Sequence, residues 1–197
     1  MVSSLQEQAL SEDLIREFVI AGHGNLTRVK QMLADHPDLL NASLKWGEND
    51  HETAIQAAAQ VGNAQIVEFL LSKGAPLKIC TLAVLGRIND LREQLDSNPE
   101  NAKALGAHGI PLLPHAVWSG NIDLVRLAYE RGATSGANLA LHNAITKGST
   151  EIVEWLLANA KPDANAKNYQ GKSPLAVARE RNNQRVAELL RKYGAAE

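Results

Sequence analysis

Apolar side chains recur along the chain at the spacing of amphipathic helices. In residues 64–72, Ile66, Val67, Leu70 and Leu71 fall on one face of a helix. The same order of isoleucine, valine and two leucines returns in residues 152–157. A second short apolar helical pattern precedes each of these stretches, so the chain reads as pairs of helices.

A glycine or an asparagine separates the two helices of each pair. Six positions have this place: Gly24, Gly62, Gly86, Gly120, Gly148 and Asn182. A reversal this tight favours a residue at positive φ, where glycine has no Cβ penalty and asparagine is the next best residue. The pattern therefore predicts one helix-turn-helix unit repeated six times, which specifies the fold but says little about chemistry.

Several units carry parts of a common motif. Residues 171–178 read G-K-S-P-L-A-V-A, unit five has His142 at the motif histidine, and unit two has Thr53 at the motif threonine. On these residues the chain resembles an ankyrin-repeat protein over nearly all of its length. Residues 108–112 (H-G-I-P-L) and 46–54 (W-G-E-N-D-H-E-T-A) are also similar to segments of small bacterial ankyrin-repeat proteins of unassigned function.

The spacing of the units departs from the usual ankyrin period of about 33 residues. Successive landmarks lie 38, 24, 34, 28 and 34 residues apart, so long and short steps alternate. A short step has no room for the β-hairpin finger that normally links two units. We expect fingers only at residues 42–52, 103–111 and 164–173, and abrupt connections near 74–79 and 133–138.

The predicted fold is an all-α ankyrin-repeat solenoid in a single domain over residues 1–197, with hairpin fingers shortened or missing at alternate junctions. The six units are expected at about residues 11–47, 48–76, 77–108, 109–135, 136–168 and 169–197. An excess of lysine and arginine in the last unit is interpreted as a polar cap on the open end of the solenoid, with a ligand-binding patch as the alternative.

Composition limits the function classes. The net charge of −2 gives no electrostatic reason to expect binding to nucleic acid or to anionic membranes. The single cysteine, Cys80, cannot form an internal disulfide, and no segment reads as a signal peptide or a membrane span. These features predict a soluble cytoplasmic protein, and charged ends on the solenoid favour a monomer.

Motifs for catalysis are weak. His108 and His115 lie seven residues apart with no second cluster of metal ligands beside them, so we expect no zinc site, no cofactor and no catalytic residues. His142 is expected to bond to the backbone, and Cys80 to be a small core residue. His23, His36 and His51 are expected to be solvated turn residues. The alternative is a small metal- or metabolite-binding enzyme that uses the histidines near the fingers.

The remaining candidate for a functional site is the surface of the predicted solenoid. In ankyrin repeats the fingers and the exposed positions of the first helices form a concave face that binds a protein partner, so this chain is expected to be an adaptor or regulator without catalysis. Trp118 either anchors a partner or packs between neighbouring units. The candidate partner-binding residues are Trp46, Asp50, His51, Gln60, His108, His115, Trp118, Asn143 and Thr146.

Overall fold

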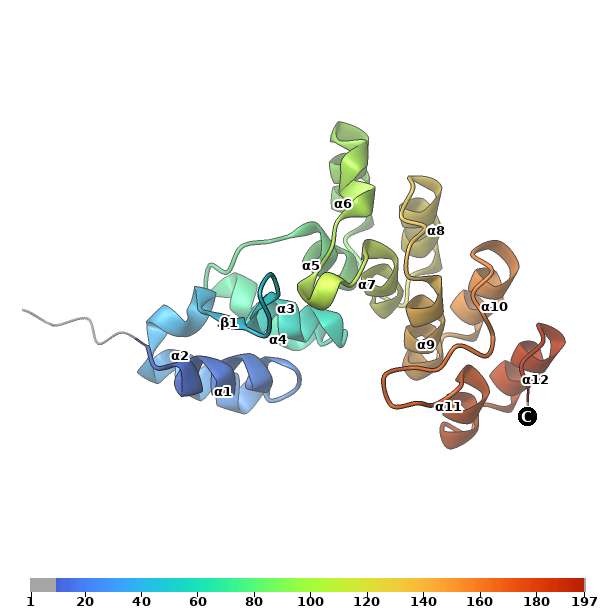
Figure 1. Ribbon diagram of the computed structural model, residues 1–197. Helices are drawn as coiled ribbons and strands as arrows, with labels where there is room; N and C mark the ends of the chain where they lie inside the picture. Colours follow the sequence, from blue (N-terminus) through green and yellow to red (C-terminus); the bar gives the residue numbers. More distant parts are fainter. Residues whose placement is uncertain (1–9, 197) are drawn as a thin grey trace, which may run out of the picture.

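Twelve helices in six antiparallel pairs build the structure. The computed structural model describes residues 10–196 (Figure 1). The helical pairs are α1 Glu12–Gly22 with α2 Leu26–Asp35, α3 Ala54–Gln60 with α4 Ala64–Ser72, α5 Ile79–Val84 with α6 Ile88–Ser97, α7 Leu112–Trp118 with α8 Ile122–Glu130, α9 Ala137–Lys147 with α10 Thr150–Asn159, and α11 Pro174–Glu180 with α12 Gln184–Lys192. The predicted solenoid of helical pairs is thereby confirmed.

The turn inside each pair explains the repeated glycine. Gly62, Gly86, Gly120, Gly148 and Asn182 all have positive φ, as predicted. Gly24 does not, so the prediction is wrong there: the backbone after α1 stays right-handed through His23, which has φ −67° and ψ −26°. In several pairs the next residue is an asparagine whose side chain caps the second helix, as Asn63 does by accepting a hydrogen bond from Ile66 N–H at 3.2 Å.

The connections between pairs alternate as expected. The first finger is an antiparallel hairpin of β1 Ser43–Lys45 and β2 His51–Thr53, in which Leu44 pairs with Glu52. The second is closed by a single bridge between Leu105 and Pro111, and the third by a bond from Asn168 N–H to the Lys172 carbonyl oxygen at 2.9 Å. Residues 75–78 and 133–136 link the intervening pairs without a finger.

Three short 3₁₀ helices complete the fold: η1 Pro37–Asn41, η2 Pro99–Lys103 and η3 Ala107–Gly109. The first two follow α2 and α6, and each begins at a proline. The third lies in the second finger and packs against β2 and α3.

The first helices form one continuous layer in which α1, α3, α5, α7, α9 and α11 pack in succession. The second helices pack in two sets. One set is α2 with α4, and the other is α6, α8, α10 and α12 in succession. Between the two sets, α4 and α6 make little contact. The buried apolar residues correspondingly fall into two main clusters, one from Phe18 to Val84 and one from Cys80 to Leu190. Figure 1 shows α1–α4 on one side of this division and α8–α12 on the other.

Candidate functional site

A groove runs along the first-helix layer and the third finger. It encloses about 870 Å³. Its walls include Gln60 and Val61 at the end of α3, Trp118 at the end of α7, Leu139 and Thr146 on α9, Tyr169 in the third finger, and Arg181 after α11. We call this surface the groove. Concave surfaces of this kind are the usual binding surfaces of stacked repeats.

Four of the predicted partner-binding residues line the groove: Gln60, Trp118, Asn143 and Thr146. They come from three helical pairs, and the packing of α7 against α9 brings two of the pairs together. Tyr169, which is not among the residues predicted from the sequence, is an exposed aromatic side chain of the groove, with 92% of its surface accessible. Val61 is also exposed there, at 38%.

Trp118 is packed between units, so the second of its two sequence interpretations holds. Its indole Nε1–H donates to the Gln60 carbonyl oxygen at 2.9 Å, a contact between residues 58 positions apart. Its ring covers Gly62 so closely that a Cβ there would lie 2.5 Å from Trp118 Cδ2. The ring also packs against the N-terminal apolar cluster, although α7 belongs to the other one. Trp118 thus joins the two clusters and forms a fixed wall of the groove.

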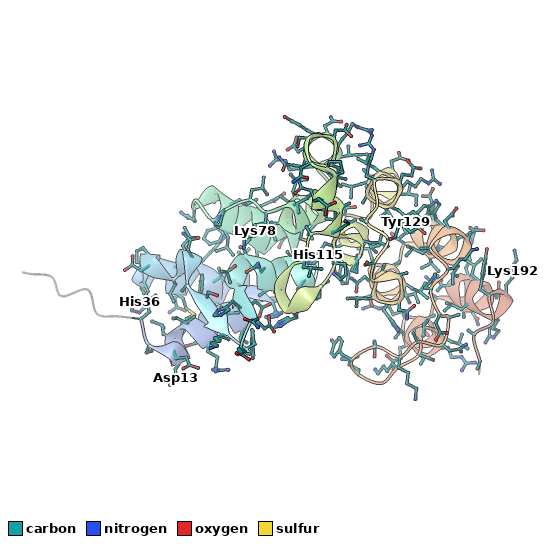
Figure 2. All side chains as sticks on the ribbon, turned by 45° about the horizontal axis from the view of Figure 1, so that its top comes forward. Asp13, His36, Lys78, His115, Tyr129 and Lys192 are labelled. Atoms are coloured by element: carbon teal, nitrogen blue, oxygen red, sulfur yellow. The ribbon has the colours of Figure 1, made fainter. Side chains whose placement is uncertain are left out.

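His115 is not a surface residue, and the prediction that it faces a partner is wrong. It is 1% exposed, and its Nδ1 lies 2.9 Å from the Pro111 carbonyl oxygen. The second finger covers it, because a Cβ on Gly106 would lie 2.7 Å from His115 Cε1. Burial lowers the pKa of His115. Figure 2 accordingly shows this residue in the middle of the molecule, where the N-terminal helices meet the later ones.

Asn143 and His142 are also held in place by the backbone. Asn143 is 8% exposed and its Nδ2 donates to the Pro114 carbonyl oxygen at 3.1 Å, so only an edge of it reaches the groove. His142 Nε2 lies 2.7 Å from the Ala166 carbonyl oxygen, which confirms the expected bond to the backbone. Both side chains therefore support the groove rather than project into it.

The first and second fingers meet in a cluster of charged and aromatic side chains, which we call the finger cluster: Trp46, Asp50, Glu52 and His108, with His23 beside them. The Asp50 carboxylate accepts the backbone N–H of His108 at 3.1 Å and lies 2.6 Å from its ring Nδ1. The Trp46 and His108 rings meet edge to face, with centroids 6.0 Å apart. Three predicted binding residues, Trp46, Asp50 and His108, therefore contact one another.

Glu52 is the centre of the finger cluster. Its side chain is fully buried, a position that is costly for a carboxylate unless it is paired. One oxygen, Oε2, accepts a hydrogen bond from Trp46 Nε1 at 2.8 Å and lies 3.4 Å from His108 Nε2. The other oxygen, Oε1, lies 3.6 Å from His23 Nε2 and has no hydrogen-bond partner among the described residues. The rings of two histidines thus lie beside this carboxylate.

The electrostatics of the finger cluster favour an ion pair. Burial lowers the pKa of His108, but the hydrogen bond to Asp50 and the charge of Glu52 outweigh burial and raise this pKa above its usual value. The hydrogen bond from His108 lowers the pKa of Asp50. His108 also has positive φ, at 56°, so the contact with Asp50 holds a backbone conformation that few residues adopt.

Glu52 is not among the binding residues predicted from the sequence, and the sequence pattern predicts that His23 is a solvated turn residue. That expectation is wrong, because His23 Nε2 contacts both Glu52 and the Gln60 side chain, the latter at 3.3 Å. The signal for Glu52 was the alternation of a strand, which sends Asp50 and Glu52 to one side of the hairpin and His51 to the other. His51 is exposed, as a residue facing a partner has to be, but it does not line the groove.

The part of the chain that the structure describes contains no arrangement of side chains suited to a metal ion. Within residues 10–196 no three histidine, cysteine, aspartate or glutamate side chains are arranged to hold a metal ion. Burial raises the pKa of Cys80 to about 12, so its thiol is a core group, as predicted. None of the helices between residues 10 and 196 combines the length and hydrophobicity of a bilayer-spanning segment.

Comparison with known proteins relates the chain to proteins built from the same repeat. A family model described as ankyrin repeats in three copies matches residues 113–196, and a model of the single ankyrin repeat matches residues 50–82. The first match covers α8–α12 and the groove residues from Trp118 to Arg181. The second match covers Asp50 and Glu52 of the finger cluster.

The chain spans about a quarter and about a fifth of the length of two relatives. An ankyrin repeat protein of fowlpox virus is 30% identical over 116 residues, which are 56% of this chain and 26% of the viral one. Ankyrin repeat protein nuc-2 of Neurospora crassa is 25% identical over 205 residues, 95% of this chain and 19% of its own. An ankyrin repeat protein of Rickettsia bellii is 47% identical over 57 residues, 26% of this chain and 34% of its own.

Proposed function

Since this chain belongs to the ankyrin-repeat family, we propose that it is a non-catalytic interaction module that binds a partner protein through the groove. Ankyrin repeats are typically protein-binding modules. The observation that carries the proposal is the groove itself, with Tyr169 92% exposed at one wall and Val61 exposed at another. An aromatic ring left in water beside a concave surface is a frequent anchor for a partner.

The rigidity of the groove also supports this function. Trp118 and Asn143 are fixed by bonds to backbone carbonyl oxygens, and the finger cluster ties the first two fingers together. A preformed surface loses little conformational freedom when it binds, so more of the contact energy appears as affinity. A cytoplasmic location belongs to the same proposal and is supported by Cys80, the single cysteine.

The alternative of a small metal- or metabolite-binding enzyme has less support. It relies on histidines near the fingers, and those side chains are already engaged: His108 with Asp50 and Glu52, and His115 with the Pro111 carbonyl oxygen. A metal would have to displace these contacts. Elemental analysis of the purified protein, with a thermal-shift screen against metabolites, tests the alternative directly.

Capture of partners with a groove variant tests the proposal. Val61→Ala with Tyr169→Ala removes two exposed side chains of the groove and should leave the fold intact. The matched control is Leu77→Ala with Tyr193→Ala, which removes exposed side chains outside the groove (42% and 38% exposed). Trp118 and His115 are avoided, because both are part of the packing.

The immobilised parent protein should retain partners from a lysate of the source organism, identified by mass spectrometry. The groove variant should lose these partners, whereas the control should keep them. Equal capture by the groove variant and the parent would refute the groove as the binding surface.

A further inference from the structure

We propose that the groove takes an extended, acidic segment of the partner protein, whose aspartate or glutamate side chains face Lys167 and Arg181. The inference deepens the proposed function and rests on the groove being the binding surface. It uses three observations: the unpaired charges of the groove, its uncharged hydrogen-bonding side chains, and its exposed apolar side chains.

The unpaired charge of the groove is positive. The groove includes three charged side chains other than histidine: Lys167, Glu180 and Arg181. Glu180 is neutralised by Lys172, whose Nζ lies 2.8 Å from its Oε2. For Lys167 and Arg181, both exposed, residues 10–196 provide no ion pair. A segment lying between the third finger and α11 therefore meets two cations, and complementary charge on the partner would favour binding.

The uncharged polar side chains of the groove suit a polypeptide backbone. Gln60, Thr146, Asn168 and Gln170 are among the residues that line the groove, and all four carry amide or hydroxyl side chains. The Gln60 side chain is held at the groove by His23, whose Nε2 lies 3.3 Å from Gln60 Nε2. Amides both donate and accept, which matches the alternating N–H and C=O groups of an extended chain. Two lysine or arginine charges are few for a nucleic acid or an anionic membrane.

The apolar side chains add a third requirement. Val61, Leu139 and Tyr169 line the groove together with the fixed ring of Trp118. A partner segment that buries these surfaces needs at least one aliphatic or aromatic side chain near its acidic residues. The inferred occupant is thus an extended peptide that combines an apolar residue with aspartate or glutamate.

Selection from a phage-displayed library of random linear peptides tests this inference. Peptides that bind the parent protein should be enriched in aspartate and glutamate. The affinity of a selected acidic peptide should fall at least about tenfold for Lys167→Glu with Arg181→Glu, because two ion pairs become repulsive. The control Arg185→Glu with Lys192→Glu makes the same change of net charge on α12, outside the groove, and should bind like the parent.

The outcomes separate this inference from the proposed function. Selected peptides that are neutral or basic, and that bind the charge-reversed variant as well as the parent, would overturn the acidic segment and leave the groove in place. Acidic peptides that bind equally to the Val61→Ala, Tyr169→Ala variant would show that they bind elsewhere and overturn the inference. Failure of the parent to select any peptide would count against both. Binding to phosphatidylserine vesicles that the charge reversal abolishes, without peptide binding, would assign the cations to a lipid surface instead.

Discussion

Replacing Gly62 by alanine tests whether Trp118 packs across the division between the two apolar clusters. Gly148 provides a matched control, because it has the same place in its helical pair and a similar backbone, with φ of 81° against 72°. A Cβ on Gly148 meets nothing within 4 Å, whereas a Cβ on Gly62 lies 2.5 Å from Trp118 Cδ2. The two substitutions therefore differ chiefly in the contact with the indole ring.

The magnitudes follow from these contacts. Alanine at left-handed φ costs about 1–2 kcal/mol at either position, and the lower entropy of the unfolded chain offsets about 0.4–1 kcal/mol of this. Gly148→Ala should therefore lower the free energy of unfolding by about 1 kcal/mol. At Gly62 the overlap with Trp118 adds about 1–3 kcal/mol. The ring cannot withdraw freely, because its Nε1–H donates to the Gln60 carbonyl oxygen.

Urea unfolding followed by far-ultraviolet circular dichroism measures the difference, and a double-mutant cycle assigns it. In a Trp118→Ala background the overlap is gone, so Gly62→Ala should then cost about 1 kcal/mol, as at Gly148. The same loss at Gly62 and Gly148 in the parent, or an unchanged loss at Gly62 after removal of the indole, would refute the packing described here.

Four further measurements test other parts of the structure. Because the pKa of His108 is raised, its ion pairs stabilise the fold fully below the unfolded pKa of about 6.5. This contribution, about 1 kcal/mol or less, is lost as the pH rises through the folded pKa. His108→Gln should therefore remove this pH dependence of the free energy of unfolding, measured with urea. The lowered pKa of His115 has the opposite sign, so stability should fall as the pH drops below about 6.5, and His115→Gln should flatten this fall. Because the Cys80 pKa is about 12, the folded protein should react with a thiol reagent at least about a hundred times more slowly than the urea-unfolded protein. Asn182 has φ of 54°, so Asn182→Ala should lower the free energy of unfolding by about 1 kcal/mol, whereas Asn182→Gly should not lower it.

Each of these measurements has a contrary result. A His108→Gln protein that keeps the parent's loss of stability as the pH rises would show that His108 is not the titrating group. A His115→Gln protein that keeps the parent's loss of stability as the pH falls would show the same for His115. Rapid labelling of Cys80 in the folded state would mean that the thiol is accessible. A lower free energy of unfolding for Asn182→Gly would contradict the left-handed turn.

The local pattern of the sequence was enough to predict the elements and their connections. Helical periodicity located the second helices, and the positive φ at Gly62 and Gly148 is the reason why glycine recurs between helices. The alternation of long and short steps predicted where fingers occur, because a short step leaves too few residues for a hairpin. These features depend on backbone geometry within one unit.

Contacts between units could not be predicted from the local pattern of the sequence. His115 has the place of an exposed first-helix residue, yet the second finger folds over it and brings Gly106 against its ring. Glu52 pairs with His108 across two fingers, 56 positions along the chain, and Trp118 reaches Gln60 over an intervening helical pair. The periodicity of the sequence does not predict such contacts, because they depend on how each finger packs against its neighbour. The same holds for Tyr169, whose exposure follows from the course of the third finger.

The most direct test of the central claim, that the groove is the binding surface, is a methyl NMR titration of the protein with a selected acidic peptide. The account predicts that the largest shift changes fall on Val61, Ile110 and Leu139, which line the groove. Leu33 and Leu40, which lie in a separate depression between α2 and α4, should stay unchanged. Shifts confined to Leu33 and Leu40, with the groove methyl groups unaffected, would contradict the account.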